Sequence, residues 1–534
     1  MQRWPPLFDA NGPVGYGATA PPEFPTCADL LRHMDRLGIP RALVWSVQAR
    51  DHHPATGNAR LLAEVQATDP KGERLVPSLV IAPSMLHEPR SVDELIAAMR
   101  THKIRALRVF PGTLRHKLRH LQPLLKKVAR FHPVLFVSVR EVADDQDLLA
   151  LAESFPQIPL VCMHAMWGQI FNFSLLDLMR RRPNLLTDTS WVHTRGTIAL
   201  VAREFGTERL VFATGGKAHN GAAVAALMHA NITDAQRAAI AHGNLERLLG
   251  LRATRAAAPA IRTSRDETLW AKFRRGELLG VNIIDAHGHL GTTGFWPLPE
   301  REIEDQVAAA LPEMDRLGIR TIIVSGEDAL FADPLEGNAK LEEKAGRHGE
   351  RIRGYFGFNP YYADRLAPRL DEFFTRPFFV GFKFLCSYWR TPVTDRRFEP
   401  ALRYAQEHHL PILLHTWDGP FDSPAMLRDI VRAYPDAIFL LGHSGGGDKG
   451  RLEAEELALA NRNVYLEWCG SFTSRIPWEE TLVRVSAERV VFGTDAVFHD
   501  FAWELGRFLS LDLPAESLLP VLGENMRGIL ARRR

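Results

Sequence analysis

Two histidines stand two positions apart at the end of an apolar run in the second half of the chain. His287 and His289 follow Ile283 and Ile284 in the segment VNIIDAHGHLG, residues 281–291. Alternate residues of a β-strand point to the same side, so both imidazoles would enter the same space. Neutral imidazole is a good ligand for zinc and similar divalent ions. The pair is therefore a candidate for part of a metal site.

Four further polar residues follow apolar runs later in the chain. These residues are Lys383 after VGF, His415 after PILL, His443 after IFLLG and Asp495 after VVFGT. If the runs are strands of a β/α barrel, their carboxyl ends meet on one face. Each residue alone has an ordinary explanation, such as a hydrogen-bonded histidine, a helix cap at Asp495 or an ion pair at Lys383. The ordered set has fewer alternative explanations and predicts one common site.

Five segments of the second half resemble the amidohydrolase-related family, in the branch with aminocarboxymuconate-semialdehyde decarboxylase-like lyases. They are IDAHGHLG (284–291), GFKF (381–384), LLHTW (413–417), LLGHSGG (440–446) and FGTDA (492–496). The resemblance implies a divalent metal, with zinc as the first candidate and one or two ions. The implied ligands are His287, His289, His415 and Asp495. His443 would be a ligand of a second metal or a catalytic acid or base.

The activity expected from this resemblance is hydrolysis of an amide, ester or lactone bond of a small molecule by a metal-activated water. Asp495 would take the proton of the water, while His443 would stabilise developing charge or protonate the leaving group. Lys383 would carry a carbamate that bridges two metals, as in binuclear relatives, or would hold a substrate carboxylate unmodified. The alternative activity is a metal-dependent lyase, a decarboxylase or hydratase of a small carboxylic acid, because the same ligands serve both chemistries.

Loop residues near the predicted strand ends are weaker candidates for substrate contacts. Arg390 and Trp417 would suit an aromatic or carboxylated substrate. The other candidates are Glu327, Asp328, Trp389, Asp418, Glu467 and His499. For any one of them an ordinary loop or packing role is the more frequent explanation.

The elements that must position these residues occur twice in the chain. MDRLGI at 34–39 recurs at 314–319. GNAR at 57–60 recurs as GNAK at 337–340, so the two copies are separated by the same number of residues as the two MDRLGI segments. In the same order, DANGPVG (9–15) corresponds to DAHGHLG (285–291), and ERLVFATG (208–215) corresponds to ERVVFGTD (488–495). Repeated segments in a fixed order indicate a tandem duplication.

Each half alternates short apolar, β-branched runs with amphipathic helical stretches. This rhythm, over about 250 residues, predicts an α/β fold of two tandem (β/α)8 barrels of the TIM type. The first barrel is expected at residues 1–250, a linker at 251–263 and the catalytic barrel at 264–534.

The first half has lost most of the candidate ligands. Asn11 and Pro13 stand at the positions of the histidine pair, and the other replacements are Arg108 for Lys383, Val137 for His415 and Gly215 for Asp495. Only His164 remains, at the position of His443. Proline and valine side chains cannot bind a metal, so the first barrel is expected to be a pseudoenzyme domain. A non-catalytic binding protein would require lost ligands in both halves, and the second half has lost none. The first barrel could supply a partner surface, as an internal pseudo-dimer or within a homo-oligomer.

Composition excludes several other classes of protein. Lys and Arg (65) nearly balance Asp and Glu (63), so no global field would draw the chain to nucleic acid or to an anionic membrane. A small-molecule substrate is the expected partner. The sequence has no signal-peptide pattern at its start and no apolar stretch of membrane length, and its four cysteines are far apart, which together predict a cytoplasmic protein.

Overall fold

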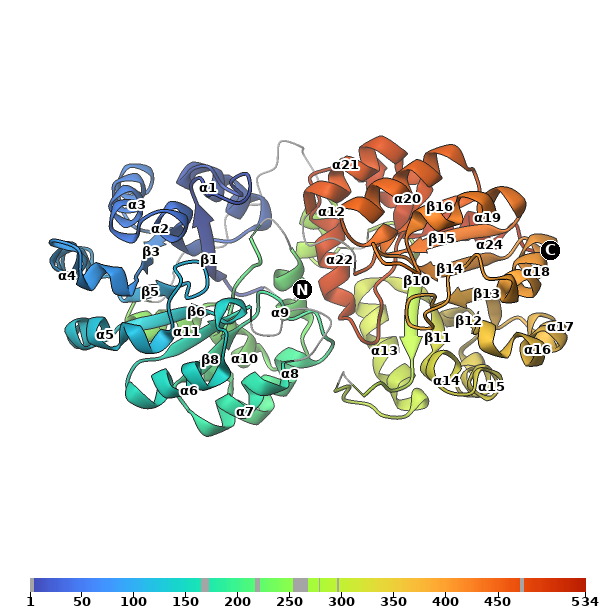
Figure 1. The fold of residues 1–534 in the computed structure, drawn as a ribbon, viewed down its shortest axis with the longest axis horizontal. Coiled ribbons are helices and arrows are strands. Elements are labelled where there is room, and N and C mark those ends of the chain that lie inside the picture. The colour runs from blue at the N-terminus through green and yellow to red at the C-terminus, as the bar shows by residue number, and fades with distance from the viewer. Residues whose placement is uncertain are drawn as a thin grey trace. The chain divides into compact units, whose positions relative to one another are not determined.

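The computed structural model describes residues 4–164, 172–216, 221–252, 268–277, 279–294, 297–470 and 475–534 (Figure 1). The chain divides into two compact units, Met1–Glu267 and Thr268–Arg534. From residue 253 onward, the predicted linker lies outside the described residues.

The C-terminal unit contains eight parallel strands, each paired with the next along the chain. They are β10 (Ile283–Leu290), β11 (Ile319–Gly326), β12 (Ile352–Gly357), β13 (Phe379–Phe384), β14 (Pro411–His415), β15 (Ile438–Gly442), β16 (Val464–Glu467) and β17 (Val490–Val491). The Ala286 N–H donates to the Phe492 carbonyl at 2.8 Å, which joins the first strand to the end of the last. The sheet is therefore a nearly closed barrel, and the α/β prediction is confirmed for this half.

The strands of this unit are buried almost throughout, because the barrel interior covers one face and helices cover the other. Inside the barrel, Ile284, Ile323, Tyr355 and Leu413 belong to one apolar cluster. The helices are α12 (Leu269–Arg274), α13 (Ile303–Leu317), α14 (Glu327–Phe331), α15 (Pro334–Ala345), α16 (Ala363–Leu366), α17 (Leu370–Phe374), α18 (Glu399–His408), α19 (Arg428–Ala433), α20 (Asp448–Ala460), α21 (Arg475–Val485), α22 (Phe501–Leu509), α23 (Ala515–Leu519) and α24 (Asn525–Leu530).

The described residues of the N-terminal unit form nine parallel strands in two sheets, ordered β1-β2-β3 and β4 to β9. They are β1 (Phe8–Val14), β2 (Arg41–Ser46), β3 (Leu75–Pro77), β4 (Leu79–Val80), β5 (Ala106–Val109), β6 (Val134–Ser138), β7 (Leu160–Met163), β8 (Leu185–Asp188) and β9 (Leu210–Val211). Ser78 separates β3 from β4, so the strands are divided between two sheets. A second closed barrel thus stays a prediction.

Helices also follow the strands of the N-terminal unit. They are α1 (Cys27–Leu37), α2 (Val47–Asp51), α3 (Pro54–Thr68), α4 (Ser91–Thr101), α5 (Gln122–Val128), α6 (Asp145–Ser154), α7 (Phe173–Arg181), α8 (Thr197–Phe205), α9 (Ala222–His229), α10 (Asp234–Ala238) and α11 (Asn244–Leu249). The repeated MDRLGI segment has the same structure in both units. It ends α1 at Gly38 (φ 74°) and α13 at Gly318 (φ 76°), where the left-handed backbone favours glycine.

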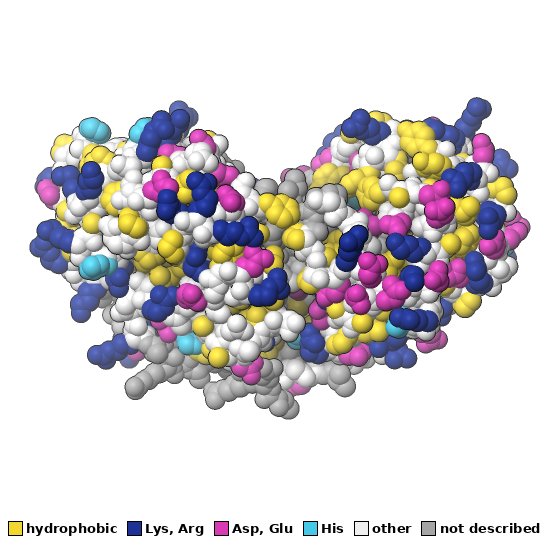
Figure 2. Space-filling view, turned by 90° about the horizontal axis from the view of Figure 1, so that it is seen from below, with side chains coloured by type: hydrophobic (Ala, Val, Ile, Leu, Met, Phe, Trp, Pro, Cys, Tyr) yellow, Lys and Arg dark blue, Asp and Glu magenta, His cyan; other side chains and the backbone are white. Residues whose placement is uncertain are grey.

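Charged side chains of both signs are interspersed on the face drawn in Figure 2, as the balanced composition predicts. Within the described part of the chain, no helix has the length and apolarity that crossing a lipid bilayer requires.

Candidate metal centre

Three of the predicted ligands meet at the carboxyl end of the C-terminal barrel. The Nε2 atoms of His287 and His289 lie 3.3 Å apart. Asp495 Oδ1 lies 3.6 Å from the first of these nitrogens and 3.1 Å from the second. Donor atoms that each lie about 2.0–2.2 Å from one shared ion have separations of this size. The side chains of His287, His289 and Asp495 could therefore hold one divalent cation.

The backbone explains why these residues meet. His287 and His289 are alternate residues of β10, so their side chains point to the same side. Asp495 follows β17, and its N–H donates to the His287 carbonyl at 2.8 Å. Closure of the barrel thus brings together residues that are more than two hundred positions apart in the chain.

Four histidines share one arrangement, in which Nδ1 lies within hydrogen-bond distance of an oxygen. The pairs are His287 with Glu467 Oε2 (3.0 Å), His289 with Glu327 Oε1 (2.7 Å), His415 with Asp422 Oδ2 (3.1 Å) and His443 with the Cys469 carbonyl (3.0 Å). Where the facing oxygen is a carbonyl or an ionised carboxylate, which only accepts, the neutral ring carries its proton on Nδ1 and keeps a lone pair on Nε2. Histidines that bind metals are oriented in this way.

The donor set fits a cation. When both rings are neutral, two Nε2 lone pairs face each other at 3.3 Å and repel unless a positive charge lies beside them. Lys383 supplies such a charge in its protonated form, because its Nζ lies 2.6 Å from Nε2 of His287. Burial lowers the pKa of Lys383, although Asp495 and other acidic groups oppose that effect. The lysine is buried, so it belongs to the interior of the site.

Burial and neighbouring charges set the ionisation of the three ligands. Burial alone would raise the pKa of Asp495, but His287 and the hydrogen bond to His289 hold it well below its usual value. Burial lowers the pKa of His287 well below its ordinary value. For His289, burial is outweighed by hydrogen bonds to Asp495 and Glu327, which raise the pKa. The site therefore offers an ionised carboxylate and a neutral imidazole at His287.

His443 and His415 continue the row of histidines. The His443 ring lies 5.1 Å from that of His287 and 4.8 Å from that of His415, measured between centroids. Burial lowers the pKa of His443 to about 3, so this ring is neutral near pH 7. Among the described residues, His415 belongs to neither of the two groups of clustered donor atoms, one of which is His287, His289 and Asp495. It lies beside His443 instead.

The two predicted substrate-binding residues occupy different places. Trp417 stacks on His415, with ring centroids 6.1 Å apart, and its centroid is 5.7 Å from that of His443. Arg390 is exposed, and among the described residues no contact joins its side chain to these histidines. Its backbone has a φ of 49° in the turn after β13.

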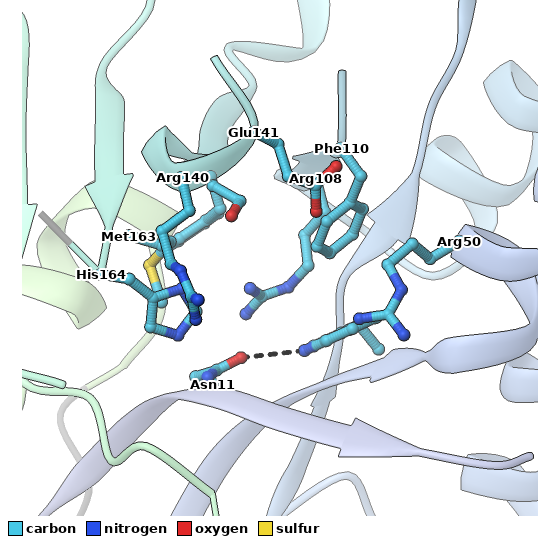
Figure 3. Close-up of a pocket in the computed structure, with 11 residues that line it drawn as sticks. Asn11, Arg50, Arg108, Phe110, Arg140, Glu141, Met163 and His164 are labelled. Atoms are coloured by element: carbon cyan, nitrogen blue, oxygen red, sulfur yellow. Dashed lines mark hydrogen bonds between the residues drawn. The ribbon is translucent and has the colours of Figure 1, made fainter. Parts of the chain in front are cut away.

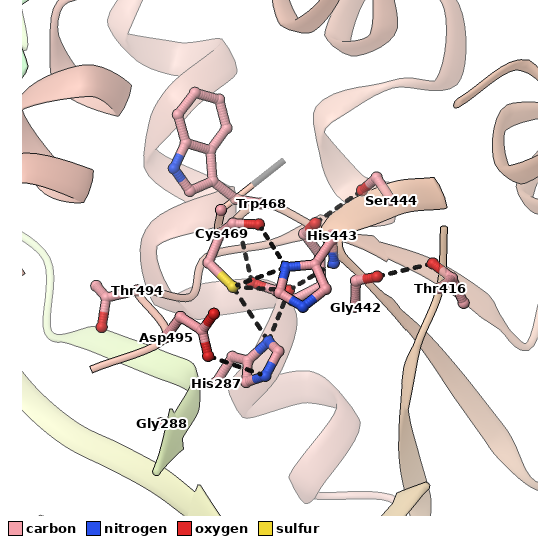
Figure 4. A network of polar contacts seen from close by, with 12 residues as sticks. His287, Gly288, Thr416, Gly442, His443, Ser444, Trp468, Cys469, Thr494 and Asp495 are labelled. Atoms are coloured by element: carbon pink, nitrogen blue, oxygen red, sulfur yellow. Dashed lines mark hydrogen bonds and ion pairs between the residues drawn. The ribbon is translucent and has the colours of Figure 1, made fainter. Parts of the chain in front are cut away.

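Several residues of the site were assigned weaker roles by the sequence or were missed. Glu327 and Glu467 were predicted as substrate contacts, but their carboxylates lie against the histidine Nδ1 atoms. Cys469 was missed, and its Sγ lies 3.1 Å from His287 Nδ1 (Figure 4). The donor atoms of His287, His443, Glu467 and Cys469 form a second group that could hold a metal ion. The position of each glutamate at a strand end was the one signal available.

Behind Asp495 lies a buried pair of titratable residues. His499 Nε2 lies 3.9 Å from Asp495 Oδ2, and His499 Nδ1 lies 3.6 Å from Glu504 Oε1. Burial would lower the pKa of His499, but Glu504 and Asp495 raise it. Asp495 therefore has, on the side away from His289, an imidazole whose protonated form is favoured by the two carboxylates.

Comparisons with known proteins find similarity in both halves of the chain. A family model described as amidohydrolase matches residues 13–251 and 284–528. Comparison with curated proteins finds no match.

Solved structures of three enzymes resemble part of the chain. A 2,6-dihydroxybenzoate decarboxylase from Rhizobium is 14% identical, with 47% of this chain and 99% of that chain covered and a TM-score of 0.38. A 5-carboxyvanillate decarboxylase from Novosphingobium aromaticivorans, complexed with manganese, is 14% identical, with 47% and 97% covered and a TM-score of 0.39. A probable 2-pyrone-4,6-dicarboxylic acid hydrolase from Acinetobacter baumannii is 12% identical, with 47% and 100% covered and a TM-score of 0.38.

Proposed function

Because the chain belongs to the amidohydrolase family, we propose that its C-terminal unit is a metal-dependent enzyme that hydrolyses an amide, ester or lactone bond of a small molecule. In this proposal both units are (β/α)8 barrels in tandem, and the N-terminal barrel is catalytically inactive. The observation that carries the proposal is the common orientation of four histidines. Each has its Nδ1 against an oxygen, so that in the neutral ring Nε2 is the nitrogen that can bind a ligand.

The metal would be held by His287, His289 and Asp495, with His415 and His443 available beside them. When bound, a divalent cation such as Zn²⁺ supplies Lewis acidity, which polarises a carbonyl and lowers the pKa of a water. Glu327 and Glu467 would orient the two imidazoles of β10. A cation would also oppose the effect of burial, which raises the pKa of Glu467 to about 8.

Asp495 is the proposed acceptor of the water proton. Its depressed pKa keeps the carboxylate ionised at neutral pH. Oδ1 faces the histidines of β10, whereas Oδ2 faces His499. His499 and Glu504 lie beside the second oxygen, where they would position the carboxylate and share its charge.

His443 has a narrower role here than the sequence left open. With its proton on Nδ1, directed to the Cys469 carbonyl, the neutral ring has no proton on Nε2 to donate. Nε2 can accept a hydrogen bond or bind a cation. We therefore assign His443 to ligand binding or to accepting a hydrogen bond, and not to protonation of the leaving group.

One observation favours the lyase as second candidate. Lys383 is a buried, nitrogen-bearing side chain within the donor cluster, and it would suit the carboxylate of an acidic substrate. A hydrolase would use the same lysine to polarise a carbonyl. The two candidates differ in their products, because only the decarboxylating lyase releases carbon dioxide without consuming water.

The experiment uses the full chain loaded with zinc or manganese and a panel of aryl esters, anilides, lactones and small carboxylic acids. Acid release without carbon dioxide supports the hydrolase, and carbon dioxide release supports the lyase. His289→Ala should abolish turnover, whereas His348→Ala, a change elsewhere in the same unit, should not. Equal turnover by the protein and by His289→Ala would contradict both candidates.

A further inference from the structure

The N-terminal unit, which lacks the metal-binding residues, contains a pocket of about 300 Å³ at the carboxyl ends of its strands (Figure 3). Trp45 of β2, Arg108 of β5 and Phe136 of β6 contribute to its wall. The pocket therefore lies where the C-terminal unit has its candidate metal centre. Its lining is rich in arginine and aromatic side chains and includes His164.

Arg108 is the cation at the centre of this pocket. It stands at the sequence position of Lys383 and is only 2% exposed. One of its terminal nitrogens donates to the Ala10 carbonyl, but its buried Nε has no hydrogen-bond partner among the described residues. In Figure 3 the guanidinium group points into the cavity. A buried guanidinium with an unused N–H is a donor that lacks an acceptor.

Nearby carboxylates do not supply that acceptor. Asp9 and Asp188 attract Arg108 at longer range, and burial raises their pKa values to about 6 and about 7. The oxygens of Asp188 accept from the His164 N–H at 3.0 Å and from Ser190 at 2.6 Å. Glu141, which lines the pocket, accepts from the Thr113 N–H at 2.8 Å. Each of these carboxyl groups thus already has its own donors.

Asp9 is held in the same way, by the backbone N–H groups of Asn11 and Thr214, each at 2.9 Å. Asn11 also lines the pocket, and its Oδ1 accepts from the Trp45 indole at 3.0 Å (Figure 3). Its amide is therefore held by the indole, and among the described residues it accepts no hydrogen bond from Arg108 Nε.

Two more arginines and three aromatic rings complete the lining. The Arg108 guanidinium lies 5.4 Å from the Trp45 ring and 5.2 Å from the Phe136 ring. Arg50 is paired with Asp51 and lies over Trp45 and Phe110. Arg140 approaches the cavity from the opposite side in Figure 3. The pocket thus combines positive charge with flat apolar walls.

We propose that this pocket binds a small organic oxyanion, a carboxylate or phosphate carried on a flat apolar body. The oxygens accept from Arg108, with Arg140 adding charge, and the apolar body lies against Trp45, Phe110 and Phe136. The N-terminal unit is then a ligand-binding domain, a role beyond the activity proposed for the C-terminal unit.

The test is calorimetric titration of the full chain with benzoate, phenyl phosphate, inorganic phosphate and benzyl alcohol. One of the first two should bind one per chain, and the better of them identifies the oxyanion. Benzyl alcohol and inorganic phosphate should bind at least ~10-fold more weakly, because each lacks one half of the recognised chemistry. Equal binding of benzyl alcohol, or no binding of either aromatic anion, would overturn the proposal.

Variants locate the site. Arg108→Met should weaken binding of the better anion at least ~10-fold. Arg140→Gln, at an exposed position, should weaken it by a smaller factor of about 3 and covers the case in which Arg108→Met fails to fold. Arg119→Gln, an exposed change in the same unit that does not line the pocket, should have no effect. Unchanged affinity in both pocket variants would overturn the proposal.

A further variant distinguishes anion binding in this pocket from binding at the candidate metal centre of the C-terminal unit. In His289→Ala the anion should still bind with unchanged affinity, even though the metal site is broken. Binding that disappears in His289→Ala and survives in Arg140→Gln would place the ligand in the C-terminal unit and would overturn the proposal. Failure of the proposed catalytic activity, by contrast, would leave this binding untouched.

Discussion

The Nζ of Lys383 lies 2.6 Å from Nε2 of His287, at the position where that imidazole presents its lone pair. Both side chains are buried. A lysine ammonium and a divalent cation cannot both occupy the same lone pair, so metal binding must displace Lys383 or remove its proton. Burial, which lowers the pKa of this lysine, favours the neutral amine that such an exchange requires.

Replacement of Lys383 separates its two predicted roles. In Lys383→Met we expect the metal content per chain to stay unchanged, because the competing ammonium is gone while the three ligands remain. We expect turnover to fall by about 100-fold or more, since a donor to the substrate is lost. Metal analysis and kcat/KM measure the two effects, with the exposed Lys449→Met as control. Loss of one ion per chain in Lys383→Met would instead indicate a carbamate bridge.

Glu327 is expected to act through His289. Glu327→Gln keeps an oxygen near Nδ1 but removes the negative charge that makes the imidazole a better donor. Metal affinity should fall by about 10- to 100-fold, as chelator competition measures. Glu336→Gln, an exposed change on the following helix, is the matched control. An affinity equal to that of the control would show that this contact does not tune the site.

Asp188 should make the stability of the N-terminal unit depend on pH. Burial raises the pKa of its carboxyl to about 7, above the value near 4 of an unfolded chain. The protonated form is therefore favoured by folding, and its contribution to stability is complete below about pH 4 and is lost as pH rises through 7. Over this range we expect a loss on the order of 1–4 kcal/mol, measured by denaturant unfolding.

Asp188→Asn should reduce that pH dependence, because an amide does not ionise. Glu73→Gln removes an exposed carboxylate of the same unit and should leave the pH profile unchanged. A profile of Asp188→Asn that matches the unmodified protein between pH 4 and 7 would exclude Asp188 as the cause.

The four cysteines should be unreactive in the folded protein. All four are buried, and burial raises the pKa of Cys27 and of Cys162 to about 12. The thiolate is the nucleophile, so iodoacetamide at pH 7.5 should label none of them before unfolding and all four afterwards. Ser154→Cys places a thiol at an exposed position and should be labelled rapidly. Rapid labelling of a native cysteine, seen by mass spectrometry, would reveal an opening of the fold.

The sequence predicted the part of the site that depends on strand periodicity. His287 and His289 were paired correctly because alternate strand residues share a side, and the repeated DAHGHLG and ERVVFGTD segments marked β10 and the end of β17. The contact between Glu467 and His287 could not be predicted, since it joins β16 to β10, which are not neighbours in the sheet. Such contacts depend on barrel geometry and side-chain direction.

Two further features of the structure have local causes that the sequence pattern does not reveal. Arg390 lies in a turn with left-handed backbone, and hydrophobic periodicity carries no information about where such a turn directs its side chain. In the first half, the segments repeated in the second half predict a second closed barrel, which stays a prediction, because the short strands β3 and β4 on either side of Ser78 belong to two separate sheets. An interruption of one residue between two strands cannot be recognised from the alternation of apolar and polar residues.

The most direct test of the account is the number of divalent ions held by the purified full chain, measured by elemental analysis after metal loading and dialysis. We expect at least one ion per chain, and none in the His287→Ala/His289→Ala double variant, while the circular dichroism of both proteins stays the same. An equal metal content in the two folded proteins, or no metal in either, would contradict a metal centre at the mouth of the C-terminal barrel.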